Sequence, residues 1–496
     1  MASSVPRPSL DHRQMDRAVG AVLGGATGDA LGVPYEYGSR PLETPARMLG
    51  GGLGNYAPGQ WSDDTEMATC ILRVAATGAD LRTAESLDRI AELFLEWAAT
   101  DPADIGIHTR DLLGEALVER ARRPDEPTGA LLTRLSTERH ARTGRTAGNG
   151  SLMRTAPVAL AHLGDPDAID GAARADSALT HADPIAGEAC VLWCMAIDHA
   201  IRAGTLDVRV GLDRVSPAWN GWLDAAERQE PAHFADHNGW VVAALQGAWS
   251  AVVRADSLPD GLQRAVAGGG DTDTVAAIAG ALLGARFGGS TVPAAERRIV
   301  HGWPGYRARD LVALAALAAR GGRPDPDGWP TVGAMSYSGN GGGGRPVPHP
   351  DDPGVLLAAA DALHPGVADA VVSLCRLGAD EVPLAGVRPE DHVEVWLVDK
   401  EDANNDLTRA VWDAAAVVRD LRTEGRTVLL HCVHAQTRTP VVAAAYGALI
   451  TGTDPGEALQ RVQRVLPSAA HPRPSVVAAL NAAVPQSIPP RPTGAQ

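Results

Sequence analysis

The stretch Gly268-Gly269-Gly270-Asp271-Thr272-Asp273-Thr274 leads directly into an apolar segment, Val275–Leu283. A glycine-rich turn followed by acidic and hydroxyl residues is typical of a loop that ends where a helix begins. A second acidic cluster, Trp61-Ser62-Asp63-Asp64-Thr65, precedes another helical segment, Glu66–Ala75. Acidic side chains at such junctions can turn inward and converge, and carboxylate and hydroxyl oxygens are the ligands that Mg²⁺ or Mn²⁺ prefers.

Both clusters lie in a region whose apolar residues recur with helical spacing. Ala- and Leu-rich segments such as Ala84–Ala99, Pro184–Ala203 and Thr274–Ala285 alternate with loops rich in Gly, Pro and Asp. Little of this region alternates with the period of two that a half-buried strand shows. The sequence therefore predicts an all-α domain over residues 12–322.

The composition changes after this domain. Residues 323–352 are rich in Gly and Pro, include Gly341–Gly344, and lack apolar periodicity. This pattern predicts a linker, with an ordered long loop as the alternative. The proline-rich residues 486–496 predict a disordered tail.

Residues 353–485 combine short apolar segments with helical ones. The predicted strands are Ala370–Leu374, Val393–Val398 and Thr427–His431, and the predicted helices are Leu407–Thr423 and Thr439–Thr451. Alternation of strands and helices favours an α/β domain with a central, mainly parallel sheet. The chain is thus expected to hold two domains of different class.

Composition narrows the possible partners. The formal charge of −16 disfavours bulk attraction to nucleic acid or to an anionic membrane, so neither is expected as a partner. Five scattered cysteines indicate a reducing cytoplasm rather than a disulfide framework. We expect no signal segment at the N-terminus and no apolar run long and uncharged enough to span a bilayer. The near absence of lysine, with Lys400 alone, in an Ala- and Gly-rich chain suggests a high-GC bacterial source.

Two further motifs in the helical region combine small and polar residues. Gly24-Gly25-Ala26-Thr27-Gly28-Asp29-Ala30-Leu31-Gly32 precedes Tyr35-Glu36, and Gly148-Asn149-Gly150-Ser151-Leu152-Met153-Arg154 precedes Pro157. A Gly-Asn-Gly-Ser loop that opens a helix presents backbone N–H groups and the positive end of a helix dipole. That arrangement suits a phosphate or a pyrophosphate.

These motifs, together with Thr180-His181 and in this order along the chain, resemble the ADP-ribosylglycohydrolase family over about residues 15–320. The resemblance implies an all-α fold with a centre of two divalent metal ions, Mg²⁺ or Mn²⁺, that acts on an ADP-ribosylated protein or small molecule. Its metal ligands fall at Ser62, Asp63, Asp64, Asp271, Asp273 and Thr274. Ser62 stands where many members have Thr, and it keeps the oxygen ligand.

The same resemblance implies further site residues. The diphosphate would be cradled by Gly148, Asn149, Gly150 and Ser151, with His181 lining the substrate pocket. In the implied reaction a metal-polarised water attacks the anomeric carbon through a transition state like an oxocarbenium ion. Glu36, which matches an acidic residue near the scissile bond, or Asp63 would serve as the base or position the leaving group.

The second domain carries a different motif, His431-Cys432-Val433-His434-Ala435-Gln436-Thr437-Arg438-Thr439-Pro440, with a Cys-x5-Arg spacing. It follows an apolar strand, Val428-Leu429-Leu430, and opens a helical segment, Val441–Leu449. A strand–loop–helix turn directs loop amides and the helix dipole at one point, which binds phosphate and lowers the pKa of the thiol. The planar fork of Arg438 can grip phosphate oxygens.

This segment resembles the cysteine-dependent protein-tyrosine and dual-specificity phosphatases over about residues 353–485. The resemblance implies a metal-independent reaction on a phosphorylated substrate, with Cys432 as the nucleophile, Arg438 as the phosphate clamp and Thr439 helping the thiolate to leave. The general acid is expected at Asp399, with Asp402 as the alternative.

One departure concerns the phosphate loop. Residues His434-Ala435-Gln436-Thr437 lack the glycine that is common in that family. Two readings of the whole chain therefore follow. It is a bifunctional hydrolase, or it is an ADP-ribosyl hydrolase whose C-terminal domain only binds phosphorylated or ADP-ribosyl ligands.

Overall fold

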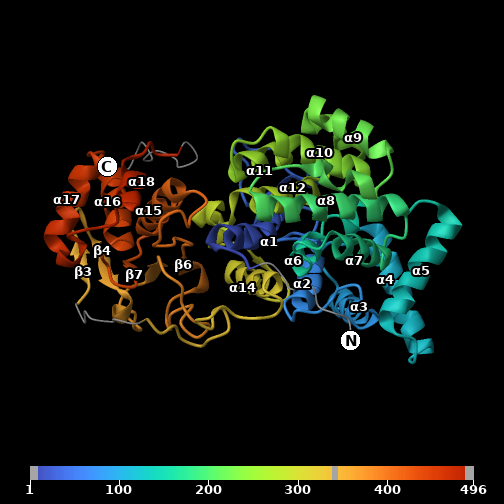
Figure 1. Cartoon of the computed structure of the whole chain (residues 1–496), viewed down its shortest axis with the longest axis horizontal. Coiled ribbons are helices and arrows are strands. Elements are labelled where there is room, and N and C mark those ends of the chain that lie inside the picture. The colour runs from blue at the N-terminus through green and yellow to red at the C-terminus, as the bar shows by residue number, and fades with distance from the viewer. Residues whose placement is uncertain (1–8, 338–344, 486–496) are drawn as a thin grey trace. The chain divides into compact units, whose positions relative to one another are not determined.

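The computed structural model describes residues 9–337 and 345–485 (Figure 1). The expected disordered tail, 486–496, lies outside the described residues, as do Gly341–Gly344 of the expected linker. The chain divides into two compact units. Unit 1 is the chain up to Val292 together with Ile299–Arg323, and unit 2 is Pro293–Arg298 together with the chain from Pro324 onward.

Unit 1 is helical, as the sequence predicts. Its α-helices are α1 His12–Gly32, α2 Asp63–Ala75, α3 Ala84–Ala98, α4 Ile107–Arg122, α5 Thr128–Thr143, α6 Ala156–Ala161, α7 Pro166–Ala178, α8 Pro184–Ala203, α9 Ala218–Arg228, α10 Val241–Val253, α11 Leu258–Ala267, α12 Thr272–Phe287 and α14 Ala308–Ala319. A short antiparallel ribbon joins β1 (His301–Gly302) to β2 (Tyr306–Arg307). The expected helices at 84–99, 184–203 and 274–285 correspond to α3, α8 and α12.

Helix α8 differs from the expectation that no apolar run is suited to a membrane. By length and composition it is the one helix among the described residues that could cross a bilayer, and 78% of its apolar window is buried inside the protein. It contacts α7, α10 and α12. A helix covered on several sides must be apolar all round, which accounts for its composition.

The packing of α1 against α12 depends on glycine. The two helices lie side by side within unit 1 (Figure 1). Glycines recur every four residues along one stripe of α1, and they are Gly20, Gly24, Gly28 and Gly32. A Cβ atom on any of the four would overlap backbone atoms of α12, including those of Gly284 and Gly280. The last of these glycines lies against Asp273, so the end of α1 adjoins the acidic start of α12.

Unit 2 is an α/β domain with a five-stranded mixed sheet. Its strands are β3 Val347–His349, β4 Asp352–Ala359, β5 Ala370–Ser373, β6 His392–Glu394 and β7 Val428–Cys432, in the order β3-β4-β7-β5-β6. Strand β3 pairs antiparallel with β4, and the other pairs are parallel. Its helices are α13 Ala294–Arg297, α15 Leu407–Thr423, α16 Arg438–Thr451, α17 Pro455–Val465 and α18 Pro474–Asn481. The sequence analysis does not predict β3 or β4.

The two faces of the sheet have different cover. Val428 and Leu430 of β7 belong to the core that includes residues of α15 and α16. Leu429, between them, packs with Leu384 and Val387 of the loop between β5 and β6. This alternation follows from the period of two along a strand. All three residues are apolar because both faces are buried.

Strand β6 is shorter than the predicted strand at Val393–Val398. Val395 N–H still donates to Ser373 C=O at 2.9 Å. Farther along, the backbone of Val398 exchanges hydrogen bonds with the Asn404 side chain, at 2.9 and 2.8 Å. Side-chain partners therefore replace the ladder, and the strand ends early.

Within the expected linker at 323–352, residues 324–337 form an ordered loop of unit 2, which agrees with the alternative reading of that stretch. Asp325 forms an ion pair with Arg376, and that guanidinium lies over the ring of Trp329, 4.6 Å from its centroid. Ala379 N–H donates to Val332 C=O at 2.8 Å. Unit 2 thus begins at Pro324, well before the predicted boundary at residue 353.

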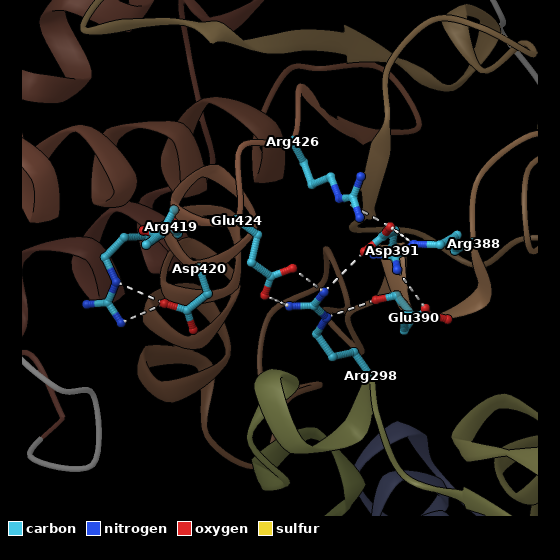
Figure 2. A network of polar contacts seen from close by, with 9 residues as sticks. Arg298, Arg388, Glu390, Asp391, Arg419, Asp420, Glu424 and Arg426 are labelled. Atoms are coloured by element: carbon cyan, nitrogen blue, oxygen red, sulfur yellow. Dashed lines mark hydrogen bonds and ion pairs between the residues drawn. The ribbon is translucent and has the colours of Figure 1, made fainter. Parts of the chain in front are cut away.

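The segment Pro293–Arg298 is built into unit 2 although its neighbours in sequence belong to unit 1. Figure 2 shows the Arg298 guanidinium reaching Glu424, at 2.6 and 2.9 Å, and the buried Asp391, at 3.1 Å. Ala294 N–H donates to both carboxylate oxygens of Asp413, at 3.1 and 2.9 Å. Helical periodicity cannot predict that Pro293–Arg298 belongs to unit 2, because this placement depends on contacts with residues more than 90 positions away in the sequence.

The glycine contact makes a direct prediction. Gly284→Ala places a methyl group against the α1 backbone, and we expect it to lower the free energy of unfolding by about 1–3 kcal/mol, as overpacking does. Gly114→Ala is the matched control, because that helical glycine faces open space among the described residues. It should instead be neutral or stabilising by up to about 1 kcal/mol. Urea unfolding followed by circular dichroism measures both, and equal stability of Gly284→Ala and the wild type would contradict the packing.

Candidate functional site

The two acidic clusters lie at helix N-termini and meet. Ser62 is the N-cap of α2, and Asp271 is the N-cap of α12. Ser62 Oγ lies 3.2 Å from Asp273 Oδ2, and Thr274 Oγ1 donates to Asp64 Oδ2 at 3.3 Å. The positive ends of the two helix dipoles favour negative charge at this point.

Asp29 in the last turns of α1 joins the clusters, and sequence reasoning assigned it no role. Its Oδ1 accepts hydrogen bonds from Ser62 N and Ser62 Oγ, both at 2.8 Å. Its Oδ2 accepts from Thr65 N at 3.0 Å and from Thr65 Oγ1 at 2.6 Å. Asp29 therefore caps the start of α2 from another helix. In the sequence, Asp29 is the one acidic residue among the glycines and apolar residues of 20–32, and this isolation is the feature that could have marked it as functional.

Within the part of the chain that the structure describes, two groups of carboxylates are close enough to hold a metal ion. Ligand oxygens of Asp29, Asp64 and Asp273 lie within 4.8 Å of one another, and so do those of Glu36, Asp271 and Asp273. Asp273 belongs to both groups. Asp64 Oδ1 is buried and has no hydrogen-bond partner among the described residues. Such an orphaned oxygen in a donor set of this kind fits a hard divalent cation.

The raised pKa values of the clustered carboxyl groups also indicate a site for a cation. Burial, followed by repulsion from neighbouring carboxylates, raises the pKa of Asp64 and of Asp273 well above the usual value. Burial and the nearby Asp271 raise the pKa of Glu36 to about 8. So many buried carboxylates cannot all carry charge without compensation. A divalent cation would supply that compensation.

Glu36 reaches the cluster through a kinked turn. Tyr37 adopts a left-handed conformation with φ 45°, and its N–H donates to Gly270 C=O at 2.7 Å. Its hydroxyl donates to Asp271 Oδ2 at 3.3 Å. Gly269 and Gly270 have φ of 80° and 73°, a region that favours glycine. These two turns fix the Glu36 carboxylate beside Asp271.

The Gly148–Ser151 loop meets the acidic cluster through one side chain. Asn149 Nδ2 donates to Asp271 Oδ2 at 2.8 Å. A Cβ atom on Gly148 or Gly150 would lie 3.2 or 3.0 Å from the imidazole of His181, so small residues allow that ring to support the loop. His181 itself is buried and accepts or donates a hydrogen bond at Nδ1 with Thr180 Oγ1 at 2.8 Å.

Ser151 ends the loop with its side chain inside the core. Its side chain is fully buried, and its Oγ accepts a hydrogen bond from Ser177 Oγ at 2.9 Å. The hydroxyl thus points into the core, where Cys190 Sγ of α8 also donates to it at 3.6 Å. Successive side chains of the short 3₁₀ turn at Asn149–Ser151 lie about a third of a turn apart, so this one points away from Asn149. A contact of Ser151 with a diphosphate would therefore use its backbone N–H, the kind of group that the loop is expected to present.

Asp63 lies at the edge of the cluster and outside both carboxylate groups, as far as the described residues go. It is partly exposed, and its Oδ2 accepts from Gly106 N at 3.4 Å. Burial and then the nearby Asp104 raise the pKa of Asp63 well above its usual range. Asp104 belongs to none of the sequence motifs, so no pattern in the sequence indicated a place for it at the site.

Unit 2 carries the second candidate site. Cys432 ends β7, the middle strand of the sheet, and α16 begins at Arg438. Arg438 Nη1 donates to the carbonyls of Leu374 and Leu397, at 2.6 and 3.2 Å. Its Nε lies 3.7 Å from Asp399 Oδ2. The expected clamp and the expected acid are therefore neighbours.

The structure also shows the positions of Asp402, the alternative general acid, and of the expected phosphate loop. Asp402 is exposed in a turn with φ 55°, and the geometry brings Asp399 rather than Asp402 to Arg438. Thr439 Oγ1 and Arg438 Nε are buried without a hydrogen-bond partner in the described part of the chain. Ala435 has φ 53°, a conformation that disfavours a Cβ by roughly 1–2 kcal/mol. The missing glycine is thus replaced by a strained alanine.

Comparison with known proteins adds to this geometry. The family model for ADP-ribosylglycohydrolase matches residues 10–326. The ADP-ribosyl-[dinitrogen reductase] glycohydrolase of Rhodospirillum rubrum is 30% identical over 288 residues, which cover 56% of this chain and 88% of the relative. The ADP-ribosylarginine hydrolase Tri1 of Pseudomonas putida is 30% identical over 287 residues, which cover 56% of this chain and 72% of the relative.

Two solved structures were also found. The ADP-ribosylglycohydrolase-related protein complex is 29% identical with a TM-score of 0.48, covering 62% of this chain and 99% of that one. Human DUSP28 is 22% identical with a TM-score of 0.23, covering 28% of this chain and 94% of that one. These two likenesses decide neither fold nor activity.

The carboxylate cluster predicts metal-linked stability. Adding MgCl₂ or MnCl₂ should raise the melting temperature, because a ligand present at 100 times its Kd stabilises the folded state by about 2.7 kcal/mol. Asp64→Asn should abolish the increment, and its metal-free form should be at least as stable as the metal-free wild type because one repelling charge is gone. Asp198→Asn is the control, since Asp198 pairs with Arg202 outside the cluster. An equal increment in Asp64→Asn and the wild type would rule out the assigned ligand.

Proposed function

The chain belongs to the ADP-ribosylglycohydrolase family through residues 10–326, and from this premise we propose that unit 1 hydrolyses the glycosidic bond of ADP-ribosylated substrates with the aid of two Mg²⁺ or Mn²⁺ ions. One observation carries the proposal, namely the convergence of Asp29, Asp64 and Asp273 around an unpartnered buried carboxylate oxygen. The proposal adds Asp29 to the ligands expected from the sequence, which are Ser62, Asp63, Asp64, Asp271, Asp273 and Thr274.

The divalent ions, when bound, would polarise a water and offset charge that develops at the sugar. The remaining work falls to side chains. Asn149, anchored to Asp271, would orient the diphosphate side of the substrate together with the backbone of its loop. We assign proton transfer from the attacking water to the Glu36 carboxylate, because Glu36 lies within the acidic groups and Asp63 lies at their edge.

We extend the proposal to the acceptor. Two relatives are named for ADP-ribosylarginine and for ADP-ribosyl-dinitrogen reductase. In this chain Asp104 lies close enough to Asp63, at the edge of the cluster, to raise the pKa of Asp63. Two acids there suit a cationic acceptor such as an arginine guanidinium. An N-glycosidic bond to arginine is therefore the first substrate to test.

The proposal predicts a hydrolysis pattern. The full chain should release ADP-ribose from an ADP-ribosylarginine protein, lose that activity with chelator, and regain it with Mg²⁺ or Mn²⁺. Glu36→Gln should lower kcat by about 10²–10⁴-fold, the range for loss of a general base, whereas Asp198→Asn should not. Release is measured by chromatography over a panel of arginine-, serine- and nucleobase-linked substrates. Inactivity across the whole panel with metal present would overturn the proposal.

We propose a second activity for unit 2, cysteine-dependent hydrolysis of phosphate monoesters. The observation that favours it is the placement of Arg438 beside Asp399 at the helix that follows Cys432, with the buried hydroxyl of Thr439 left for a ligand. Cys432 Sγ would attack phosphorus, Asp399 would protonate the departing oxygen, and water would then cleave the S–P bond to return the thiolate and inorganic phosphate. This cycle uses no metal and needs the reduced thiol that a cytoplasm maintains.

The phosphatase proposal has its own test. Cys432→Ser should abolish turnover of para-nitrophenyl phosphate, whereas Cys375→Ser should retain it. Cys375 is the matched control because burial raises the pKa of its thiol to about 12, which leaves it protonated at neutral pH. Wild-type protein that binds inorganic phosphate without turnover would support the alternative of a binding domain. Turnover that survives Cys432→Ser would contradict the proposal.

A further inference from the structure

Three buried polar side chains form a chain that ends at Cys432. Ser373 lies at the end of β5, His392 at the start of β6 and His431 in β7. Ser373 Oγ is 2.9 Å from His392 Nε2 and 2.7 Å from His431 Nε2. All three residues are buried, and Ser373 and His431 are fully so. The phosphatase chemistry proposed above gives none of them a role.

The donor and acceptor roles in these hydrogen bonds follow from the contacts of His392. Leu384 N–H donates to His392 Nδ1 at 2.9 Å. A ring nitrogen that accepts a backbone N–H carries no proton, so the proton of the neutral ring is on Nε2. His392 Nε2–H therefore donates to Ser373 Oγ.

The direction of the hydrogen bond between Ser373 and His431 follows from the one that Ser373 accepts. Its oxygen already accepts from His392, so its hydroxyl proton is free to be donated. If His431 also donated to it, the Ser373 O–H would be left without an acceptor at a fully buried position, which is unfavourable. Ser373 Oγ–H thus donates to His431 Nε2, and the proton of His431 is on Nδ1.

The remaining nitrogen of His431 faces the start of the phosphate loop. Nδ1 lies by the backbone of Cys432, although it makes no well-aligned hydrogen bond among the described residues. Burial and the Arg438 guanidinium lower the pKa of His431 to about 4, so the ring is neutral at physiological pH. Its tautomer therefore matters more than its charge.

We propose that Ser373 and His392 are positioning residues for the Cys432 site, which hold His431 in the Nδ1–H form and so present an N–H to the first peptide of the phosphate loop. This inference rests on the phosphatase function proposed for unit 2. A donor at that position favours negative charge on the loop side, and hence the thiolate. The opposite tautomer would present a lone pair there and disfavour the thiolate.

Among the described residues, charged and titratable groups around this site come from several segments. Cys375 follows β5, Arg438 begins α16, and Asp399 follows β6. The Asp399 carboxylate pairs with both Arg438 and Arg473. Cys375 stays protonated through the neutral range, because burial raises its pKa to about 12. A thiol that titrates near neutral pH in unit 2 therefore reports on Cys432.

The test measures the pH dependence of Cys432 alkylation by iodoacetamide in the full chain, with the modified cysteine identified by mass spectrometry. Ser373→Ala should raise the midpoint of the profile by about one pH unit, close to a tenfold loss of thiolate below the midpoint. Ser373→Thr keeps the hydroxyl and should restore the wild-type midpoint. Thr423→Val is the control, because its hydroxyl bonds to Arg419 C=O on α15, away from the site.

The outcomes separate the two proposals. If Cys432 of the wild type titrates like an ordinary thiol, the phosphatase function fails. If the wild type has a lowered midpoint that Ser373→Ala leaves unchanged, the positioning role fails and the phosphatase function stands. Nitrogen-15 NMR of the wild type gives a check that needs no variant, because its histidine shifts report the tautomer. The Nδ1–H form of His431 is expected, and the Nε2–H form would overturn the inference.

Discussion

The close contact of α1 with α12 is the constraint on which the site in unit 1 depends. Glycine at four positions of α1 lets its backbone reach the backbone of α12. That approach sets Asp29, in the last turns of α1, against the start of α2 and next to Asp273. With larger residues at the contact the helices would separate, and three carboxylates from three helices could no longer share one ion. The same stripe of glycines therefore determines both the packing of α1 on α12 and the convergence of the carboxylates.

Burial of several carboxylates at one point is unfavourable for the protein alone. The structure offsets part of this repulsion with two helix N-termini and with hydroxyl donors from Ser62, Thr65 and Thr274. The remainder is left for a cation, as the unpartnered oxygen of Asp64 indicates. Unit 2 has the opposite kind of unpartnered group, because the buried Thr439 hydroxyl has no hydrogen-bond partner among the described residues. The phosphate site proposed for unit 2 would use it.

Sequence alone predicted the parts of this molecule that local pattern determines. Helices α8 and α15 begin and end at the predicted residues, because Asp183 and Asp406 cap them and the apolar spacing is regular. The acidic clusters were placed correctly at helix starts. Asp29 and Asp104 were missed, because the role of each depends on which element packs opposite. The exchange of Pro293–Arg298 into unit 2 likewise depends on distant partners such as Asp391 and Glu424.

Anomalous diffraction from crystals of the full chain grown with Mn²⁺ tests the central claim most directly. Two strong manganese peaks are predicted within unit 1, both ligated by Asp273, one of them also by Asp29 or Asp64 and the other also by Asp271. Well-ordered carboxylates in this cluster with no manganese peak between them would contradict the account.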